Sequence, residues 1–418
     1  MIQRPKGTED IFGKKGNNLA FLISYINSFM PLYNYNYLKT PTFEQSELFY
    51  RGVGDTTDIV NKETYDFKDK GGRDMTLRPE MTASAARSLI ENKLYTNVSY
   101  VEKFYYIGSC FRYERPQSGR LREFQQFGIE AFGCKNPALD AEVISVGYRL
   151  LESLGITGMT VKLNTLGDTE SRKMHKEALL KHFEKEIDNM CEDCKARFKK
   201  NPLRILDCKI DGESDIVKNA PKTVDYLTEE SKTYYEELKS CLEDMEIPYE
   251  EDSKLVRGLD YYSHTVFEIV SDLKGLGPAS TILGGGRYDS LVETIGGPST
   301  GGVGFAMGIE RLLLILENEE INIDEMKMDA YIINMSKTND AYMILDELRK
   351  EGYRVETDYM GKNMKGQFKQ VDRTNPTYVI IVGEDEVKGD YVTVKDNLTK
   401  ESEQVKRINL VDYMRTHC

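Results

Sequence analysis

The sequence has no long hydrophobic run, no cysteine framework and no apolar leader. No uninterrupted apolar stretch approaches the roughly 20 residues of a membrane-spanning helix, so we expect no membrane association. The opening residues, MIQRPKGTEDIFGKKG, lack the apolar core of a secretory signal peptide. The seven cysteines are scattered and odd in number, which fits a reducing compartment better than a set of disulfides. These absences predict a cytoplasmic protein.

Several common catalytic signatures are also missing. The four histidines, at 175, 182, 264 and 417, form no cluster with metal-ligand spacing. The glycine-rich stretch GGVGFAMG at 301–308 is not followed by GK[ST], so it is not a Walker loop. It also lacks the spacing and the distant acidic residue of a dinucleotide-binding fingerprint.

Three cysteines lie close together in the sequence. Cys191 and Cys194 form a C-x-x-C pair, which is half of a zinc site, and Cys208 follows without a second pair at a fitting spacing. We therefore expect no tightly bound protein metal, and whether these cysteines bind anything stays open.

The net charge of −13 argues against a protein whose whole surface binds polyanions. Residues 327–418 contain 15 basic and 16 acidic residues, so this part is almost neutral while the rest is acidic. A local basic patch on the neutral part would still suit a nucleic acid.

The 418 residues are enough for two or three domains. Helical periodicity predicts helices over 16–33, 82–89 and 140–154, and the Gly71-Gly72 pair between alternating runs predicts a hairpin. A Lys- and Glu-rich helical segment over roughly 170–255 interrupts the strands. A linker near 321–327 then precedes alternating strands and helices, which predict a mixed or parallel sheet.

The richest candidate site is the pair of strands and polar loop from Gly108 to Gly133. Arg112 lies on the first strand, and period two places Gln126 and Glu130 on one face of the second. Burying such groups is costly without partners, so this face predicts a polar pocket for a charged ligand. A surface hairpin with solvated charges explains the same residues.

Two further segments carry candidate residues. In TLRPEMTASAAR, Thr82 is a candidate helix cap, and Glu80 is a candidate ligand for an ammonium group; a simple helix start explains both. In RGLDYYSHTVFEI the pattern predicts a strand that opens at Arg257, either at a solvated strand mouth or against an anion.

Glycine and arginine recur before the last helix of the acidic part. In GFAMGIERL the glycines permit a close backbone approach and Arg311 falls on the first helical turn, an arrangement that suits a phosphate tail. Helix packing explains the glycines alone.

Four basic residues in the neutral part share a helical spacing. Lys362, Lys365, Lys369 and Arg373 are expected to form one basic face of a helix. An ordinary solvated face is the alternative.

The motifs together resemble those of the histidyl-tRNA synthetase family, within the class II aminoacyl-tRNA synthetases, over essentially the whole chain. The resemblance rests on RPKGTEDIFG, TLRPE-T, FRYERPQSGRLREFQQFGIE, RGLDYY, GGGRYD, GFAMGIERL, NPLRILDCK and VIIVGEDE, in this order. It implies an α+β catalytic domain over 1–325, with an antiparallel sheet flanked by helices and a helical insertion at about 170–253. It also implies a C-terminal α/β anticodon-binding domain over 326–418.

The resemblance further implies the substrates and partners. They are L-histidine, ATP with Mg²⁺, and tRNA(His), whose 3′ end would receive histidine from a histidyl-adenylate. A homodimer is implied, with an interface that includes the segment ending at Pro41.

Residue roles follow from the same resemblance. Arg257 and Arg112 are the expected catalytic residues. The expected histidine-binding set is Glu80, Thr82, Gln126, Glu130, Tyr261 and Tyr262; the ATP-binding set is Arg112, Arg120 and Arg311; and the tRNA-binding set is Arg115, Gln117, Lys362, Lys365 and Lys369.

One position departs from the family pattern, in which RPEGT is the commoner form. Met81 adds bulk beside Glu80 here, so the amino-group site is expected to differ slightly in shape. The departure leaves a second candidate, the inactive paralogue that regulates ATP phosphoribosyltransferase, although that paralogue generally lacks the C-terminal domain. An RNA-binding or signalling protein that keeps the fold without turnover is a third.

Overall fold

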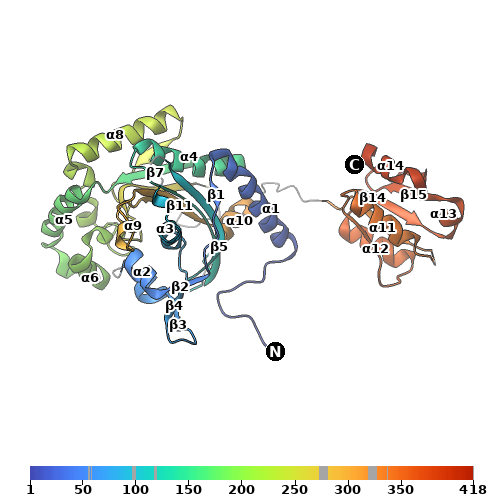
Figure 1. Cartoon of the computed structure of the whole chain (residues 1–418), viewed down its shortest axis with the longest axis horizontal. Helices are drawn as coiled ribbons and strands as arrows, with labels where there is room; N and C mark the ends of the chain where they lie inside the picture. The colour runs from blue at the N-terminus through green and yellow to red at the C-terminus, as the bar shows by residue number, and fades with distance from the viewer. Residues whose placement is uncertain are drawn as a thin grey trace. The chain divides into compact units, whose positions relative to one another are not determined.

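The chain folds into two compact units, Met1–Ile323 and Asp324–Cys418 (Figure 1). The computed structural model describes residues 1–417 except 55, 56, 58, 97–99, 117–119, 273–280, 319–326 and 337. The linker expected near 321–327 therefore lies outside the described residues, apart from Lys327.

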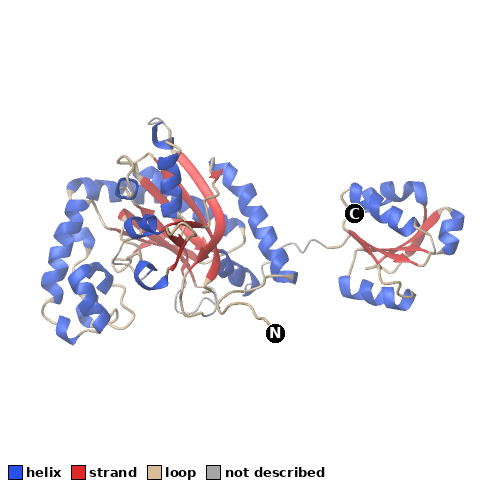
Figure 2. Ribbon diagram, turned by 60° about the horizontal axis from the view of Figure 1, so that its bottom comes forward, coloured by secondary structure: helices blue, strands red, loops and turns tan. Residues whose placement is uncertain are grey.

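The first unit is built on an eight-stranded sheet with the order β1-β5-β6-β11-β10-β9-β7-β8 (Figure 2). Only the outer pairs β1–β5 and β7–β8 are parallel, and the remaining neighbours are antiparallel. The predicted α+β class with a largely antiparallel sheet is thereby confirmed. The strands are β1 (Asn36–Tyr37), β5 (Glu102–Phe111), β6 (Glu123–Phe132), β7 (Met159–Thr165), β8 (Tyr249–Glu251), β9 (Ser263–Ser271), β10 (Thr281–Arg287) and β11 (Gly302–Gly308).

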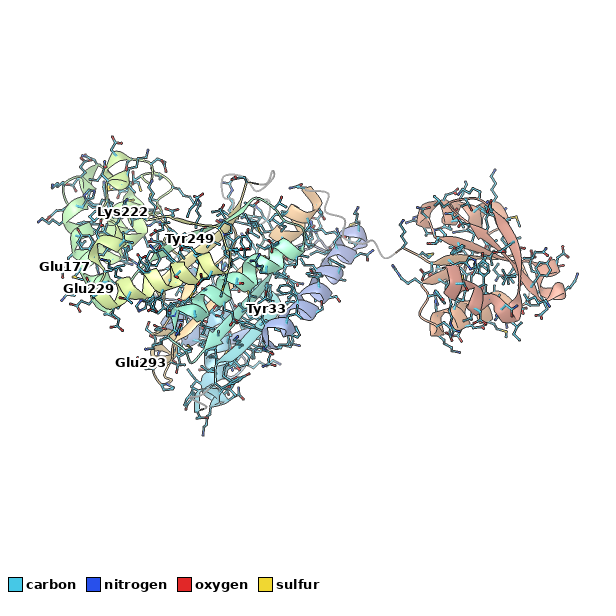
Figure 3. The ribbon with its side chains drawn as sticks, turned by 90° about the horizontal axis from the view of Figure 1, so that it is seen from above. Tyr33, Glu177, Lys222, Glu229, Tyr249 and Glu293 are labelled. Atoms are coloured by element: carbon cyan, nitrogen blue, oxygen red, sulfur yellow. The ribbon has the colours of Figure 1, made fainter. Side chains whose placement is uncertain are left out.

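Four helices cover one face of this sheet with their apolar sides. They are α1 (Gly13–Phe29), α4 (Pro137–Ser153), α8 (Glu229–Asp244) and α10 (Ile309–Asn318), and they share one apolar core with the sheet. In Figure 3, α4 and α8 lie side by side, with Tyr33 just beyond the end of α1. The helix predicted over 16–33 ends at Phe29 and continues as a 3-10 turn, because Pro31 has no N–H to donate.

A buried ion pair ties the sheet to this helical layer. Arg287, at the end of β10, is fully buried, and its Nε lies 3.0 Å from Oδ1 of Asp140 on α4. The Oδ2 atom of Asp140 also accepts hydrogen bonds from Tyr234 and Thr265, at 2.8 and 2.5 Å. Full hydrogen bonding of this kind is what makes a buried charge tolerable.

The opposite face of the sheet is covered less completely. Helix α3 (Thr82–Glu91) packs there with α9 (Leu291–Thr294). Helix α2 (Ser46–Gly52) contacts both of these helices, and a three-stranded sheet with the order β2-β4-β3 contacts α2. Strands β3 (Tyr65–Lys68) and β4 (Asp74–Leu77) form the predicted hairpin around Gly71-Gly72, and β2 is Phe43–Gln45.

Helices α5 (Thr169–Phe183), α6 (Glu192–Lys200) and α7 (Asp215–Lys218) form an insertion with a small apolar core of its own. Helix α8 follows them in the chain, but its Leu238 and Leu242 are buried against the main core instead.

The second unit has a mixed five-stranded sheet, with the order β13-β12-β14-β15-β16, and apolar cores on both faces. None of the helices within the described part of the chain is long and apolar enough to span a bilayer. The strands are β12 (Ala330–Asn334), β13 (Val355–Thr357), β14 (Tyr378–Val382), β15 (Tyr391–Asp396) and β16 (Ser402–Lys406); the helices are α11 (Asp340–Lys350), α12 (Met364–Thr374), α13 (Glu384–Gly389) and α14 (Leu410–His417).

Candidate active site

The centre of the less covered sheet face is polar, and the strand register explains why. Alternation along β6 points Phe127 and Ile129 into the apolar core, so that Gln126 and Glu130 face the other side. Glu130 lies opposite Gly304 of the neighbouring strand β11. A carboxylate therefore faces a position that has no side chain.

Glycines are required on this face because polar side chains occupy the space above them. A Cβ atom on Gly304 would lie 2.0 Å from Oε2 of Glu130, and one on Gly284 would lie 2.5 Å from Nη1 of Arg257. At Gly304 the Cβ atom would also lie 2.2 Å from the backbone oxygen of Ile129, and at Gly284 the guanidinium of Arg257 would have to move. The glycines of GGGRYD and GFAMG thus form the floor of a site and do not loop around a phosphate.

A cavity of about 340 Å³ opens above this floor. Residues far apart in the sequence line it, including every residue expected to bind histidine or ATP or to act in catalysis. They are Glu80, Thr82, Arg112, Arg120, Gln126, Glu130, Arg257, Tyr261, Tyr262 and Arg311.

Glu130 is the most deeply buried acid in the cavity, with 1% of its surface exposed. The hydroxyl of Tyr106 donates to its Oε1 atom at 2.8 Å, and the hydroxyl of Tyr288 donates to Oε2. Burial raises the pKa of the Glu130 carboxyl to about 8, against the opposing effect of these hydrogen bonds. Glu130 is therefore a proton-binding group near neutral pH.

Glu80 has the capping role that the sequence analysis gave to Thr82. Helix α3 begins at Thr82 itself, and the carboxylate of Glu80 accepts from the backbone N–H groups of Thr82 (2.7 Å) and Ala83 (2.9 Å). The prediction that Thr82 caps the helix was wrong. Thr82 is the first helical residue, so its own backbone N–H is one of the donors that a cap must satisfy. The Glu80 carboxylate can accept more hydrogen bonds than these two, so it can also bind a ligand. Met81 is buried in apolar surroundings beside Gly108.

Arg257 does not open a strand, contrary to the sequence prediction. Strand β9 begins at Ser263, and residues 257–262 form a loop that folds over the floor. The guanidinium of Arg257 forms an ion pair with Glu268 of β9, whose other oxygen accepts from Thr281 at 2.6 Å. Strand propensity overrated this segment because its aromatic residues line a cavity instead of a pleated surface.

Three more arginines approach the same cavity. Arg112 follows the last residue of β5; its Nε donates to the carbonyl of Pro79 at 2.9 Å and its guanidinium lies 5.2 Å from the ring centroid of Phe124. Burial, followed by the charge of Arg120, lowers the pKa of Arg311. Cations brought this close favour an anionic ligand.

The sequence analysis missed Tyr106, Tyr288 and Glu268, which hold the charged groups of the cavity in place. Tyr106 lies on the even-numbered face of β5, and Arg112, which directly follows the strand, has the same parity, so period two could have identified Tyr106. Tyr288 lies in the GGGRYD motif, directly after Arg287. Glu268 pairs with Arg257, and the alternating pattern of β9 could have indicated which face it occupies.

The expected tRNA-binding residues lie elsewhere. Arg115 is exposed, and Gln117 lies outside the described residues. Lys365 and Lys369 are exposed on α12, as is Arg373. Lys362 precedes this helix, whose N-cap is Asn363, so the predicted four-residue face contains three helical members. The N-cap side chain accepts from Gly366 N–H and sets the start of the helix.

Comparisons with known proteins agree with this architecture. The family model described as histidyl-tRNA synthetase matches residues 7–312, and the one described as an anticodon binding domain matches residues 329–417. The histidine–tRNA ligase of Macrococcus caseolyticus is 48% identical over 417 residues, with 99% of each chain covered. That of Staphylococcus haemolyticus is 47% identical over 419 residues, again with 99% of each chain covered.

A solved structure extends the likeness to three dimensions. The apo histidyl-tRNA synthetase of Staphylococcus aureus superposes with a TM-score of 0.84 at 41% identity, covering 99% of this chain and 100% of that one. A synthetase model over most of the first unit and an anticodon-binding model over the second place the chain among the aminoacyl-tRNA synthetases. Within that class the chain belongs to the histidyl-tRNA synthetase family, which confirms the family predicted from its motifs.

Proposed function

We propose that the protein is a histidine–tRNA ligase. It activates L-histidine with ATP to give histidyl-adenylate and diphosphate, and it then transfers the histidyl group to the 3′ end of tRNA(His). The observation that carries the proposal is the convergence of Arg112, Arg257 and Arg311 on one cavity with the buried acids Glu80 and Glu130.

The arginines serve the phosphate chemistry. The carboxylate of histidine attacks the α-phosphorus of ATP, so two anions must meet while charge grows on the phosphoryl oxygens. Arg112 and Arg257 hold the α-phosphate, and Arg311 with Arg120 holds the outer phosphates of the Mg²⁺–ATP complex. Fixed guanidinium groups in a partly buried site stabilise this charge with little reorganisation.

Glu268 prepares Arg257 for this role. Its carboxylate already holds the guanidinium in place, and Gly284 leaves room for the group above the sheet. An arginine that is positioned before ATP binds loses less conformational entropy on binding.

The buried acids serve the amino acid. Glu80, Thr82 and Gln126 bind its α-amino group and backbone end. Glu130 reads the imidazole with Tyr261 and Tyr262, and Tyr106 and Tyr288 orient the Glu130 carboxyl. An acid and neighbouring phenols can satisfy both ring nitrogens, and an amino acid without these groups leaves buried polar atoms unpaired.

The tRNA contacts and the assembly complete the proposal. Arg115 and Gln117 meet the acceptor end, and Lys365 and Lys369, with Lys362 beside them, contact the anticodon region. The protein works as a homodimer in the cytoplasm, with the segment up to Pro41 at the interface.

Histidine-dependent exchange between ATP and pyrophosphate on the purified protein tests the function. Arg257→Ala should reduce this exchange by about 10³-fold or more, equivalent to ~4 kcal/mol of transition-state stabilisation, with a modest loss of histidine affinity. Arg415→Ala, on the exposed surface of α14, is the matched control and should leave exchange unchanged.

Two results would contradict the proposal. Near wild-type exchange in Arg257→Ala would remove the arginine from the mechanism. No exchange in the wild-type protein would favour the regulatory paralogue or a non-catalytic RNA-binding protein.

A further inference from the structure

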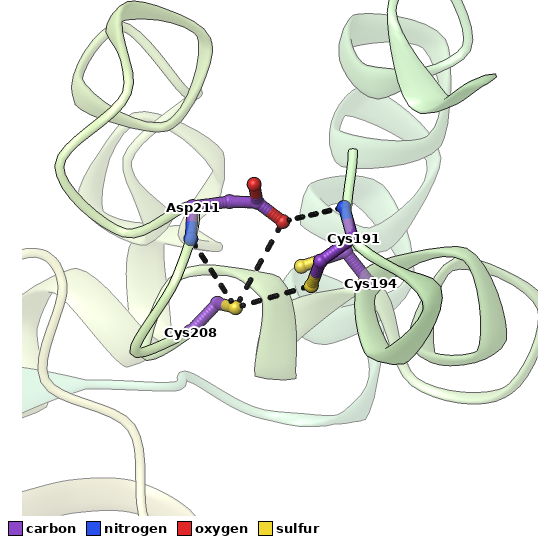
Figure 4. A group of neighbouring side chains, drawn as sticks. All are labelled: Cys191, Cys194, Cys208 and Asp211. Atoms are coloured by element: carbon purple, nitrogen blue, oxygen red, sulfur yellow. Dashed lines mark hydrogen bonds between the residues drawn. The ribbon is translucent and has the colours of Figure 1, made fainter. Parts of the chain in front are cut away.

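Three thiols and a carboxylate meet in the helical insertion, on elements that do not line the cavity. The metal-binding atoms of Cys191, Cys194, Cys208 and Asp211 all lie within 4.8 Å of one another (Figure 4). Cys194 and Cys208 are buried, with 0% and 7% of their surfaces exposed. Within the part of the chain that the structure describes, this is the one group of three or more such side chains.

The four residues come from two short turns with the same spacing. Cys191 occupies the position directly before α6, and Cys194 follows three positions later in the first turn of that helix. Cys208 and Asp211 repeat this separation in a second turn. Because the last member is an aspartate, a search for paired cysteines overlooks the second pair. The full pattern, C-x₂-C-x₁₃-C-x₂-D, brings two ligand pairs to one point, as structural zinc sites do.

The distance between two of the three sulfurs fits ligands of a tetrahedral ion. A Zn–S bond of ~2.3 Å places two sulfurs on a tetrahedron about 3.8 Å apart. The observed distance between Sγ of Cys191 and Sγ of Cys208 is 3.7 Å. A disulfide requires roughly 2.05 Å, so these sulfurs stand at the separation of shared ligands and not of a bonded pair.

Backbone groups support the arrangement on the side of the second turn. The N–H of Asp211 donates to Sγ of Cys208 at 3.4 Å, and the N–H of Cys191 donates to Oδ2 of Asp211 at 3.0 Å. The turn is so tight that a Cβ atom on Gly212 would lie 2.3 Å from the carbonyl oxygen of Cys208. Amide donors to ligand sulfur and oxygen atoms are the usual outer support of a metal site.

We propose that Cys191, Cys194, Cys208 and Asp211 bind one structural zinc ion. Three thiolates with one carboxylate suit zinc, whereas calcium and magnesium prefer all-oxygen sites. The ion joins α6 to the second turn in a segment whose own apolar core is small.

The site also reaches the loop that carries Arg257. Lys254 donates from Nζ to the carbonyl of Gly212 at 3.3 Å, and Asn201, just after α6, donates to Oδ1 of Asp260 at 3.0 Å. The zinc ion thereby fixes the base on which this loop rests. Binding of this ion can be measured by metal content and cobalt spectra, both of which are independent of the proposed ligase activity.

Metal analysis of the full chain, purified under reducing conditions without chelator, is the first test. We expect about one zinc ion per chain in the wild-type protein and in the control Cys241→Ser, whose thiol lies on α8. Cys208→Ser should lower the zinc content at least about tenfold. The proposal would be overturned if the wild-type protein held far less than one zinc ion per chain, or if Cys208→Ser held as much zinc as the wild type.

Cobalt substitution provides a test that does not depend on folding of a cysteine variant. After zinc is removed with a chelator, Co²⁺ added to the wild-type protein should give a thiolate-to-cobalt charge-transfer band and the visible bands of a tetrahedral site. Asp211→Cys should retain the metal and strengthen the charge-transfer band, because it replaces the one oxygen ligand with sulfur. An octahedral cobalt spectrum without charge transfer would overturn the assignment, as would a Cys191–Cys208 disulfide in the protein as isolated.

Discussion

The two large sheets of this protein use their central strands in opposite ways. In the second unit, Val379 and Ile380 of β14 point to opposite faces, and each is buried in an apolar core. In the first unit one face is apolar throughout, whereas the other combines an apolar cluster under α3 with glycines beneath buried charges. A binding site can form on a face of a sheet that lacks packed side chains, provided that apolar contacts on the other face hold the strands together.

The largest effect should come from filling the glycine floor. Gly304→Ala would place a methyl group 2.0 Å from Oε2 of Glu130, so either the acid or the strand must move. We expect histidine-dependent exchange to fall by about 10³-fold while the far-ultraviolet circular dichroism stays the same. Exchange at the wild-type rate would show that the floor tolerates a side chain.

Ile380→Ala makes the opposite change in the second unit. It should cost about 2–5 kcal/mol of that unit's stability and leave exchange unaltered, as measured by thermal unfolding and the exchange assay in parallel. A drop in exchange without a stability loss would contradict the division of roles between the sheets.

The buried charges on the first sheet should make the stability of the protein depend on pH, mainly through Glu130. Its carboxyl has a pKa of about 8 in the folded chain, above that of the unfolded chain, so folding takes up a proton between about pH 5 and 8. The stability that this proton brings is present below that window and is lost as the pH rises through it.

Glu130→Gln should remove this dependence. We expect the wild-type melting temperature to fall more steeply than that of Glu130→Gln between pH 6 and pH 8. The variant should also discriminate less well against other amino acids in the exchange assay. Parallel melting curves and unchanged discrimination would argue against a protonated acid that reads the imidazole.

The smallest effect should come from the exposed helix α12. Charge reversal at Lys365 and Lys369 should raise the KM for tRNA several-fold, flatten its dependence on salt, and leave adenylate formation alone. Reversal of the exposed Lys350 and Lys388 provides a control with the same change in net charge. Equal effects of the two double variants would show that α12 is an ordinary solvated face.

The sequence predicted the site best where a simple period applies. Gln126 and Glu130 follow from alternation along β6, since a strand has only two faces. Tyr288 does not follow in this way, because its partner Glu130 is distant in the chain and only the folded sheet brings the two together. The same reason applies to Glu268 and Arg257, whose pairing depends on a loop that local propensity assigned to a strand.

Other errors came from single hydrogen bonds. The start of α12 at Met364, which leaves Lys362 outside the helix, is set by the side chain of Asn363. The cap of α3 belongs to Glu80 and not to Thr82. One capping bond contributes about 1 kcal/mol, too little to be visible in a hydrophobic pattern but enough to fix a helix boundary.

The ion pair between Arg287 and Asp140 links the helix-covered face of the first sheet to the cavity on its other face. Arg287 directly precedes Tyr288, whose hydroxyl donates to Glu130. The position of Tyr288 therefore depends on an ion pair that lies outside the cavity. Replacement of Asp140 would leave Arg287 buried without its main counter-ion, which destabilises the fold, and would also disturb the strand end that positions Tyr288.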